Sequence, residues 1–189
     1  DQKNPSTTLL EDGHFVTAWE SQNQDGSGYG IYGQLHNADG TMLGGEFQVH
    51  TYNLSSNAQQ TNPSVTALKN GDFVVTWQGT YQDGGDSNTG VFGQRFGADG
   101  TAKGDEFQVN TYTYQSQQEP SIAALDGGGF VVTWESNHQD YSSTFGIYGK
   151  LYDAEGEAEG YEFQVNTYEQ GNEENPSVTD LDGGGFVVT

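Results

Sequence analysis

Gly127-Gly-Gly-Phe-Val-Val-Thr-Trp-Glu135 decides the fold, because the chain repeats this stretch at a regular interval. The copies are Gly71-Asp-Phe-Val-Val-Thr-Trp-Gln78, Gly13-His-Phe-Val-Thr-Ala-Trp-Glu20 and the shorter Gly183-Gly-Gly-Phe-Val-Val-Thr189. Their phenylalanines, Phe15, Phe73, Phe130 and Phe186, lie 58, 57 and 56 residues apart. The chain is therefore a tandem array, and we expect its function to be carried by repetition.

The composition is strongly acidic, with 27 Asp and Glu against 5 Lys and Arg and a net charge of −22. Such a surface repels phosphates, so neither nucleic acid nor an anionic membrane is an expected partner, whereas divalent cations suit it. No apolar run is long enough to span a membrane, and the absence of cysteine excludes disulfides and thiolate chemistry. The high charge is typical of disorder, but 13% aromatic residues in regularly placed short runs indicate a folded β protein.

Each repeat contains four strand-like runs, which in the second copy are residues 63–68, 73–77, 90–95 and 106–112. Asn70-Gly71 joins the first two runs and Asp99-Gly100 joins the last two, and such pairs predict tight hairpins of two residues. A long polar loop separates the second and third runs. A linker of roughly ten polar residues leads to the next Pro-Ser, and no stretch shows a helical period.

Four antiparallel strands every 56–58 residues predict an all-β array of four-stranded blades, most simply of the β-propeller type. The predicted repeats are 5–62, 63–119 and 120–175, followed by a partial repeat over 176–189. Three and a half blades cannot close alone, so we expect an open or incomplete propeller. It would be completed by neighbouring repeats of a longer chain or by copies of itself. Tandem β-sandwich-like modules and a helical fibre of repeats are the alternatives.

The recurring text Pro-Ser-Val, Asp-Gly-Gly-Phe-Val-Val-Thr-Trp-Glu-Ser, Gly-Ile-Tyr-Gly-Gln and Glu-Phe-Gln-Val-Asn-Thr-Tyr resembles tandem repeats of very large secreted bacterial surface proteins. Such adhesin-like proteins often also carry RTX-type calcium-binding or cadherin-like segments. The resemblance covers residues 5–189 and implies a secreted or cell-surface setting. It supplies no catalytic residues, and the RTX nonapeptide is absent from this sequence.

Acidic loops between the second and third runs are candidate calcium sites, because Ca²⁺ takes six to eight oxygen ligands on a flexible loop. The best candidate loop offers Asp83, Asp86 and Asn88, and the other two loops offer Asp25 and Asp140. None of these loops has the EF-hand spacing, and a solvated turn shaped by Asp and Gly is the alternative interpretation. We expect any bound Ca²⁺ to offset the acidic repulsion.

The aromatic residues have two interpretations. Trp19, Trp77 and Trp134 end the apolar strand and are expected to pack between blades. The alternative is a lectin-like propeller in which loop tyrosines stack on glycans, with Tyr29, Tyr81 and Tyr141 as the candidates.

Enzyme chemistry finds little support in the sequence. Arg95 is the only arginine, so the arginine cluster of a sialidase-like propeller is missing, and the four histidines fall at different places in the repeat. A glycosidase needs two convergent carboxylates, and we find none that stands out from the repeat. The sequence therefore predicts a non-enzymatic structural or adhesive segment of a secreted or surface protein. We expect this segment to assemble with copies of itself.

Overall fold

The computed structural model describes residues 1–189 except 27, 53–57, 84–87, 141–143 and 168–170. Its regular structure in the described ranges consists of β-strands. They are β1 (Gln2–Leu9), β2 (Phe15–Gln22), β3 (Tyr29–His36), β4 (Met42–Gln48), β5 (Gln60–Ala67), β6 (Phe73–Thr80), β7 (Thr89–Phe96), β8 (Ala102–Gln108), β9 (Gln117–Ala124), β10 (Phe130–Asn137), β11 (Phe145–Tyr152), β12 (Ala158–Gln164), β13 (Val178–Asp180) and β14 (Phe186–Val188). Nothing in the described ranges forms a helix with the length and apolarity needed to cross a bilayer.

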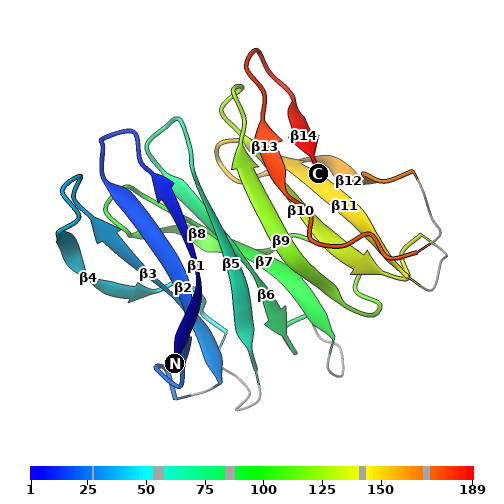
Figure 1. The fold of residues 1–189 in the computed structure, drawn as a ribbon, viewed down its shortest axis with the longest axis horizontal. Coiled ribbons are helices and arrows are strands. Elements are labelled where there is room, and N and C mark those ends of the chain that lie inside the picture. The colour runs from blue at the N-terminus through cyan, green and yellow to red at the C-terminus, as the bar shows by residue number, and fades with distance from the viewer. Residues whose placement is uncertain (27, 53–57, 84–87, 141–143, 168–170) are drawn as a thin grey trace.

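Three four-stranded antiparallel sheets follow one another along the chain (Figure 1). Strands β1 to β4, β5 to β8 and β9 to β12 each pair in chain order, and β13 pairs with β14. We call the three sheets blades 1 to 3 and the last pair blade 4. Figure 1 shows the first strands of the blades, β1, β5, β9 and β13, next to one another. The prediction of an all-β array of four-stranded antiparallel blades is confirmed.

The turn between the first two strands of a blade differs from the expected two-residue hairpin. In blade 2 the Gly71 amide donates to the Leu68 carbonyl at 3.1 Å, and the Leu68 amide donates to the Asp72 carbonyl at 2.8 Å. Gly71 has a φ of 85°. This is a four-residue β-turn closed by a one-residue glycine bulge, a combination that matches the twist of the flanking strands. The glycine is needed at the bulge, where a side chain is disfavoured.

The second strand of blades 2 and 3, β6 and β10, buries both of its faces. Phe73 and Trp77 of β6 pack toward blade 1, where they join a core that includes Val16 of β2. Val74 of the same strand points the other way and packs with Trp134 of β10 in blade 3. Trp77 and Trp134 are fully buried, so the prediction that the tryptophans pack between blades holds for these two.

A glycine in the third strand of each blade allows the fourth strand to approach. A Cβ atom on Gly33, Gly93 or Gly149 would lie within 2.6–2.8 Å of a phenylalanine ring, which is too close for any real contact. Those rings belong to Phe47, Phe107 and Phe163 in the fourth strands. The strand glycine therefore marks a close approach of an aromatic ring to the backbone.

The serine of each Pro-Ser pair joins one blade to the next. Its hydroxyl oxygen accepts a hydrogen bond from a backbone amide in the inner strand of the following blade, at 3.2–3.4 Å. The three bonds are Val65 to Ser6, Ile122 to Ser64 and Val178 to Ser121. Because the same bond recurs at each boundary, the inner strands meet in an equivalent way along the array.

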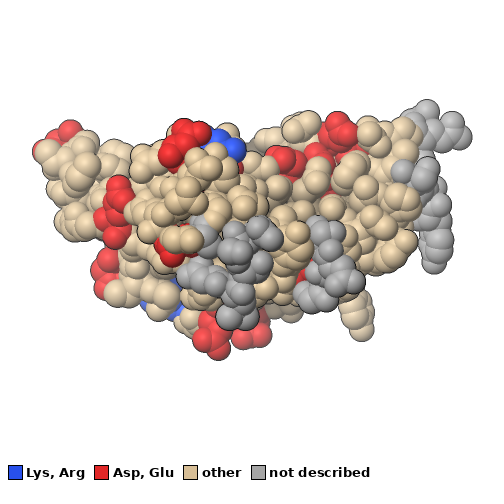
Figure 2. Space-filling model, turned by 90° about the horizontal axis from the view of Figure 1, so that it is seen from below, with Lys and Arg blue, Asp and Glu red and all other residues tan. Residues whose placement is uncertain are grey.

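Recurrent glutamates of the fourth strands also join neighbouring blades. The Glu106 carboxylate accepts bonds from the Thr51 amide of the preceding segment, at 2.8 Å, and from the Gln82 side chain of its own blade. Glu162 accepts equivalent bonds from Thr111, at 2.8 Å, and from Gln139, at 2.7 Å. Part of the acidic excess is thus used in contacts between blades. Figure 2 shows other acidic side chains at several places on the visible face, with few basic ones.

Candidate functional site

A residue with positive φ, here called the bulge residue, lies immediately before the proline of each Pro-Ser pair, and in blades 1 to 3 it belongs to the first strand of the blade. The bulge residues are Asn4, Asn62, Glu119 and Asn175, and their backbone φ angles are 50°, 53°, 52° and 57°. In blades 1 to 3 the pairing of the inner strand shifts register at this place. Asparagine adopts positive φ more readily than most residues, whereas glutamate does so rarely. Strain of this kind persists where the surrounding structure enforces it and is frequent at functional sites.

These bulges surround an open pocket of about 390 Å³, which we call the axial pocket. It is lined by Asn4, Pro5, Asn62, Pro63, Ser64, Glu119, Pro120, Ser121 and Pro176. The loops that follow the second strands lie at the same end of the blades as the start of β1, since the Gln22 amide donates to the Asp1 carbonyl at 2.9 Å. Figure 1 shows the N-terminus and several loops at this end.

A second set of polar side chains, from the middle strands β2, β6 and β10, supports the bulges. Each accepts a hydrogen bond from the backbone amide of the bulge residue in the next blade. The pairs are Asn62 to Glu20 at 2.8 Å, Glu119 to Gln78 at 3.0 Å and Asn175 to Glu135 at 2.6 Å. The axial pocket is therefore bordered by a continuous polar network that crosses every blade boundary.

Glu119 is the acid of the axial pocket. Its carboxylate is half-buried and accepts a hydrogen bond from the Asn62 side-chain amide at 2.5 Å. Burial raises the pKa of the Glu119 carboxyl above its ordinary value, and the Glu135 and Glu20 carboxylates raise it further. A carboxyl group with a raised pKa holds its proton closer to neutral pH, which is the property a general acid needs.

The other two carboxylates of the network are turned inward. Glu20 and Glu135 are 0% and 2% exposed. The Lys3 ammonium lies 3.3 Å from Glu20, whose other oxygen accepts from Asn4 at 2.7 Å, and Gln118 donates to Glu135 at 2.9 Å. Both groups are held by neighbours and are shielded from any molecule in the pocket, so they act on the axial acid only through their charge.

Glu119 could have been found in the sequence, contrary to the conclusion that no carboxylate stands out from the repeat. The residue before Pro-Ser is asparagine in three copies, Asn4, Asn62 and Asn175, and glutamate only here. A run of about ten polar residues before the proline predicts a linker, and a single acid does not stand out in a linker. In the structure, β5 begins at Gln60 and β9 at Gln117, so the residues before each proline belong to the inner strand.

The aspartates predicted to bind calcium lie in separate blades, each close to a glycine of the third strand. Asp25 is nearly fully buried and contacts Nε2 of His50 at 3.0 Å. A Cβ atom on Gly146 would lie 3.1 Å from an Asp140 oxygen, and one on Gly90 would lie 3.4 Å from the Cβ of Asp83. These side chains are folded back over their own blades.

The remaining calcium candidates add little to the geometry. The Asn88 carbonyl accepts a hydrogen bond from the Tyr81 amide at 3.3 Å, and Asp86 lies outside the described residues. Within the described ranges no three His, Asp or Glu side chains gather in an arrangement that could hold a metal ion. Calcium binding stays a prediction.

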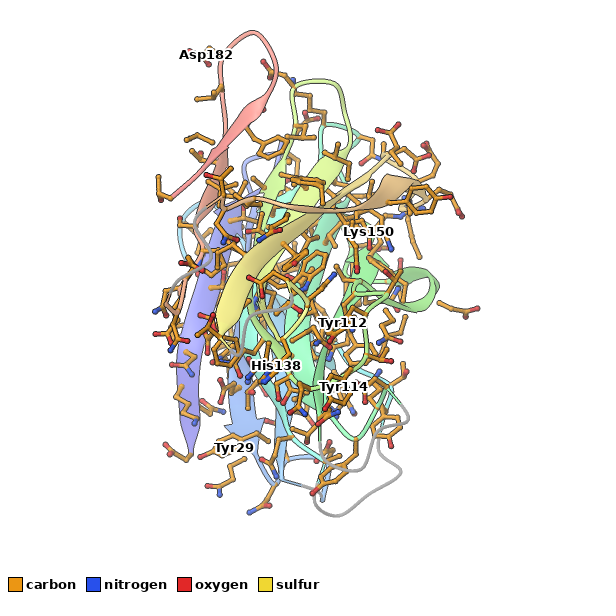
Figure 3. The ribbon with its side chains drawn as sticks, turned by 90° about the vertical axis from the view of Figure 1, so that its right-hand side faces the viewer. Tyr29, Tyr112, Tyr114, His138, Lys150 and Asp182 are labelled. Carbon is orange, nitrogen blue, oxygen red and sulfur yellow. The ribbon has the colours of Figure 1, made fainter. Side chains whose placement is uncertain are left out.

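The candidate tyrosines are also dispersed. Tyr29 is half-buried, with the Lys3 ammonium 4.2 Å from its ring centre. Tyr81 is 37% exposed, and Tyr141 lies outside the described residues. A different aromatic pair, Tyr112 and Tyr114, packs edge to face at 6.4 Å, and Figure 3 shows it near His138 toward the end where Tyr29 lies. Glycan stacking by Tyr29, Tyr81 and Tyr141 stays a prediction.

No protein-family model matches the sequence, and no curated protein is a significant match. Solved structures do match. A thermostable family-43 glycoside hydrolase superposes with a TM-score of 0.60 at 12% identity, over 95% of this chain and 61% of its own. An endo-arabinase from Bacteroides thetaiotaomicron superposes with a TM-score of 0.57 at 16% identity, over 98% of this chain and 73% of its own. An α-L-arabinanase from Penicillium chrysogenum, complexed with arabinobiose, superposes with a TM-score of 0.67 at 16% identity, over 98% of this chain and 58% of its own.

At these identities the likeness shows the fold alone, and it agrees with the predicted propeller-type blades. The chain spans less than two thirds of the family-43 hydrolase and of the arabinanase.

These neighbours correct three expectations. They contradict the resemblance to adhesin-like repeats, the non-enzymatic structural or adhesive function and the conclusion that the protein is not an enzyme. The physical reason is that the repeated residues are those that pack one blade on the next. Such residues specify an architecture, while function depends on particular residues placed upon it.

Proposed function

We propose that this chain forms the axial part of a glycan-hydrolysing propeller in which Glu119 is the general acid. The single observation that carries the proposal is the position of Glu119. It is the one bulge residue of the axial pocket that bears a carboxyl group, and it does so on a backbone conformation that disfavours glutamate. The glycoside hydrolases among the structural neighbours support the choice of reaction.

In the proposed role Glu119 donates its proton to the glycosidic oxygen as the bond to the sugar breaks. The raised pKa of Glu119 keeps that proton in place at higher pH, and the Asn62 amide fixes the direction of the carboxyl group. Glycoside hydrolysis also requires a second carboxylate, as nucleophile or base. Glu20 and Glu135 are too buried for that role, so the proposal assigns the acid alone.

Arabinose-containing oligosaccharides are the first substrates to test, because two of the neighbours described above are an endo-arabinase and an arabinanase. We also propose that the protein acts outside the cell, where polymeric glycans are encountered. This agrees with the setting expected from the sequence.

The test is the release of reducing ends from a panel of α-linked arabino-oligosaccharides and other plant glycans. Glu119→Gln keeps the shape of the side chain but removes the proton, and we expect it to lower the rate by about 10²–10⁴-fold. Glu157→Gln, at an exposed turn, is the control and should leave the rate unchanged. The absence of product from the whole panel, or full activity of Glu119→Gln, would overturn the proposal.

A further inference from the structure

The polar network around the axial pocket contains a paired exchange. At the boundaries between blades 1 and 2 and between blades 3 and 4, the backbone amide of an asparagine donates to a glutamate side chain. Asn62 donates to Glu20, and Asn175 donates to Glu135. At the boundary between blades 2 and 3 both residues differ: the donor is Glu119 and the acceptor is Gln78. Wherever the bulge carries a neutral side chain its support is a carboxylate, and where the bulge carries a carboxylate its support is neutral.

We propose that Gln78 is the positioning residue that makes an acid at the axis possible. This role rests on the proposed function, because it concerns the same carboxyl group, but it is a physical claim about the folded protein. Gln78 acts through contacts with its neighbours and does not itself meet a substrate.

The hydrogen bonds show how Gln78 holds the acid. Its side-chain oxygen accepts from the Glu119 backbone amide at 3.0 Å and from the Asn62 side-chain amide at 3.2 Å. The same Asn62 amide nitrogen donates to the Glu119 carboxylate. Gln78 therefore fixes both the strained backbone of the acid and the group that orients its carboxylate.

The charges show why this support must be neutral. The carboxylates of Glu20, on β2, and Glu135, on β10, already act on Glu119. Lys3 of β1 is the cation of the network, and it pairs with Glu20 of β2 within blade 1. A glutamate at position 78 would be a third carboxylate acting on Glu119. Its oxygen would take the place of the Gln78 oxygen that accepts from the Glu119 backbone amide. Like charges in a partly buried site are costly, and this one would have no adjacent cation to offset it.

A double-mutant cycle between positions 78 and 119 tests the inference by thermal unfolding. Gln78→Glu should lower Tm by roughly 3 °C or more at pH 8. In the Glu119→Asn background the same change restores the pair found at the other two boundaries, and it should cost nothing. Glu119→Asn alone should raise Tm, because asparagine accepts a positive φ better than glutamate.

The pH provides a second measurement. The axial acid takes up its proton as the pH falls through its raised pKa, so the penalty of Gln78→Glu should shrink between pH 8 and pH 4. Carbon-13 NMR should show the Glu119 carboxyl titrating at higher pH in Gln78→Glu than in the parent protein. The Glu119 signal is identified by its loss in Glu119→Gln.

The inference would be overturned if Gln78→Glu lowered Tm equally in both backgrounds and at both pH values. That result is expected if the Gln78 amide only fills space and its charge does not matter. An unchanged Glu119 titration would overturn it as well. Both measurements use the unliganded protein, so failure to hydrolyse any glycan would defeat the proposed function and leave this result standing.

Discussion

The carboxylate of Asp25 and the imidazole of His50 meet at 3.0 Å, with both side chains almost completely buried. The Ile31 amide lies 3.1 Å from Nδ1 of His50, and the contact with Asp25 is made through Nε2. Blades 2 and 3 have asparagine in the place of His50, and there Asn110 and Asn166 accept the equivalent backbone bond. The pair is thus a local variant of a structural contact.

The first prediction concerns this pair. Asp25→Ala removes the carboxylate that pairs with a buried imidazole nitrogen and should lower the free energy of unfolding by about 1–3 kcal/mol. His50→Asn restores the residue of the other blades and should cost less than about 1 kcal/mol. Chemical denaturation of the two single variants and the double variant measures this. Equal losses from Asp25→Ala with and without His50→Asn would show that the two side chains are not coupled.

The second prediction concerns the tryptophans. Trp77→Ala empties a fully buried position between blades 1 and 2 and should cost about 3–5 kcal/mol. Trp19 lies on the face of β2 that points away from blade 2 and is only half-buried, so Trp19→Ala should cost distinctly less. Denaturant unfolding of both variants gives the comparison, and equal losses would contradict the packing described here.

Association with copies of the chain or with neighbouring repeats stays a prediction. It can be measured as the molecular mass in solution over a range of concentrations.

The third prediction concerns Lys150, which is buried where blades 1 and 2 have Gln34 and Gln94. Its ammonium donates to the Val109 carbonyl at 3.1 Å. Burial lowers the pKa of Lys150 below its ordinary value of 10.5, and the Glu162 carboxylate offsets part of that change. Because the folded state binds this proton less tightly than the unfolded chain does, the charged lysine destabilises the fold below its folded pKa. The penalty disappears as the pH approaches the unfolded value.

Lys150→Gln should therefore raise Tm by about 2–4 °C at pH 7, and the gain should shrink toward pH 10.5. Lys69→Gln is the matched control. The hydrogen bond with Asp126 raises the pKa of Lys69, so its replacement should leave Tm unchanged or slightly lower. A fall in Tm for Lys150→Gln at neutral pH would contradict this account.

The fourth prediction separates calcium from general screening. With a net charge of −22, the fold should become more stable as NaCl is raised from low concentration, because screening weakens self-repulsion. If Ca²⁺ binds the loops, as the sequence predicts, millimolar CaCl₂ should raise Tm beyond NaCl of equal ionic strength. Asp83→Asn should then abolish that extra gain. Equal midpoints in the two salts would remove the calcium prediction.

The architecture was readable from the sequence because it depends on repeated local patterns. Phe73-Val-Val-Thr-Trp77 is apolar on both faces, and only a strand covered on both sides has that composition. A glycine inside a strand is typical of a close approach to the backbone, and at Gly93 the Phe107 ring makes that approach. The turn type was predicted less well, since Asn70-Gly71 fits both a two-residue hairpin and the β-turn with a bulge that occurs.

The site was harder to predict because it is made by the bulges. Nothing local shows that Glu119 and Gln78 lie on adjacent strands of different blades, 41 residues apart in the chain. The tyrosines and aspartates of the loops drew attention as isolated polar or aromatic residues. A comparison of the copies position by position would have revealed the exchange, because it identifies where one copy departs from the others.

The serine bond that recurs at every blade boundary has an evolutionary consequence. Because the serine bond is the same at each boundary, duplication of one segment yields a new unit that can dock on its neighbours in the same way. The shared serine bonds also leave other positions of each copy free to diverge, since these bonds help to hold the array together. A single copy can then acquire a reactive group while the other copies keep an amide at the same position.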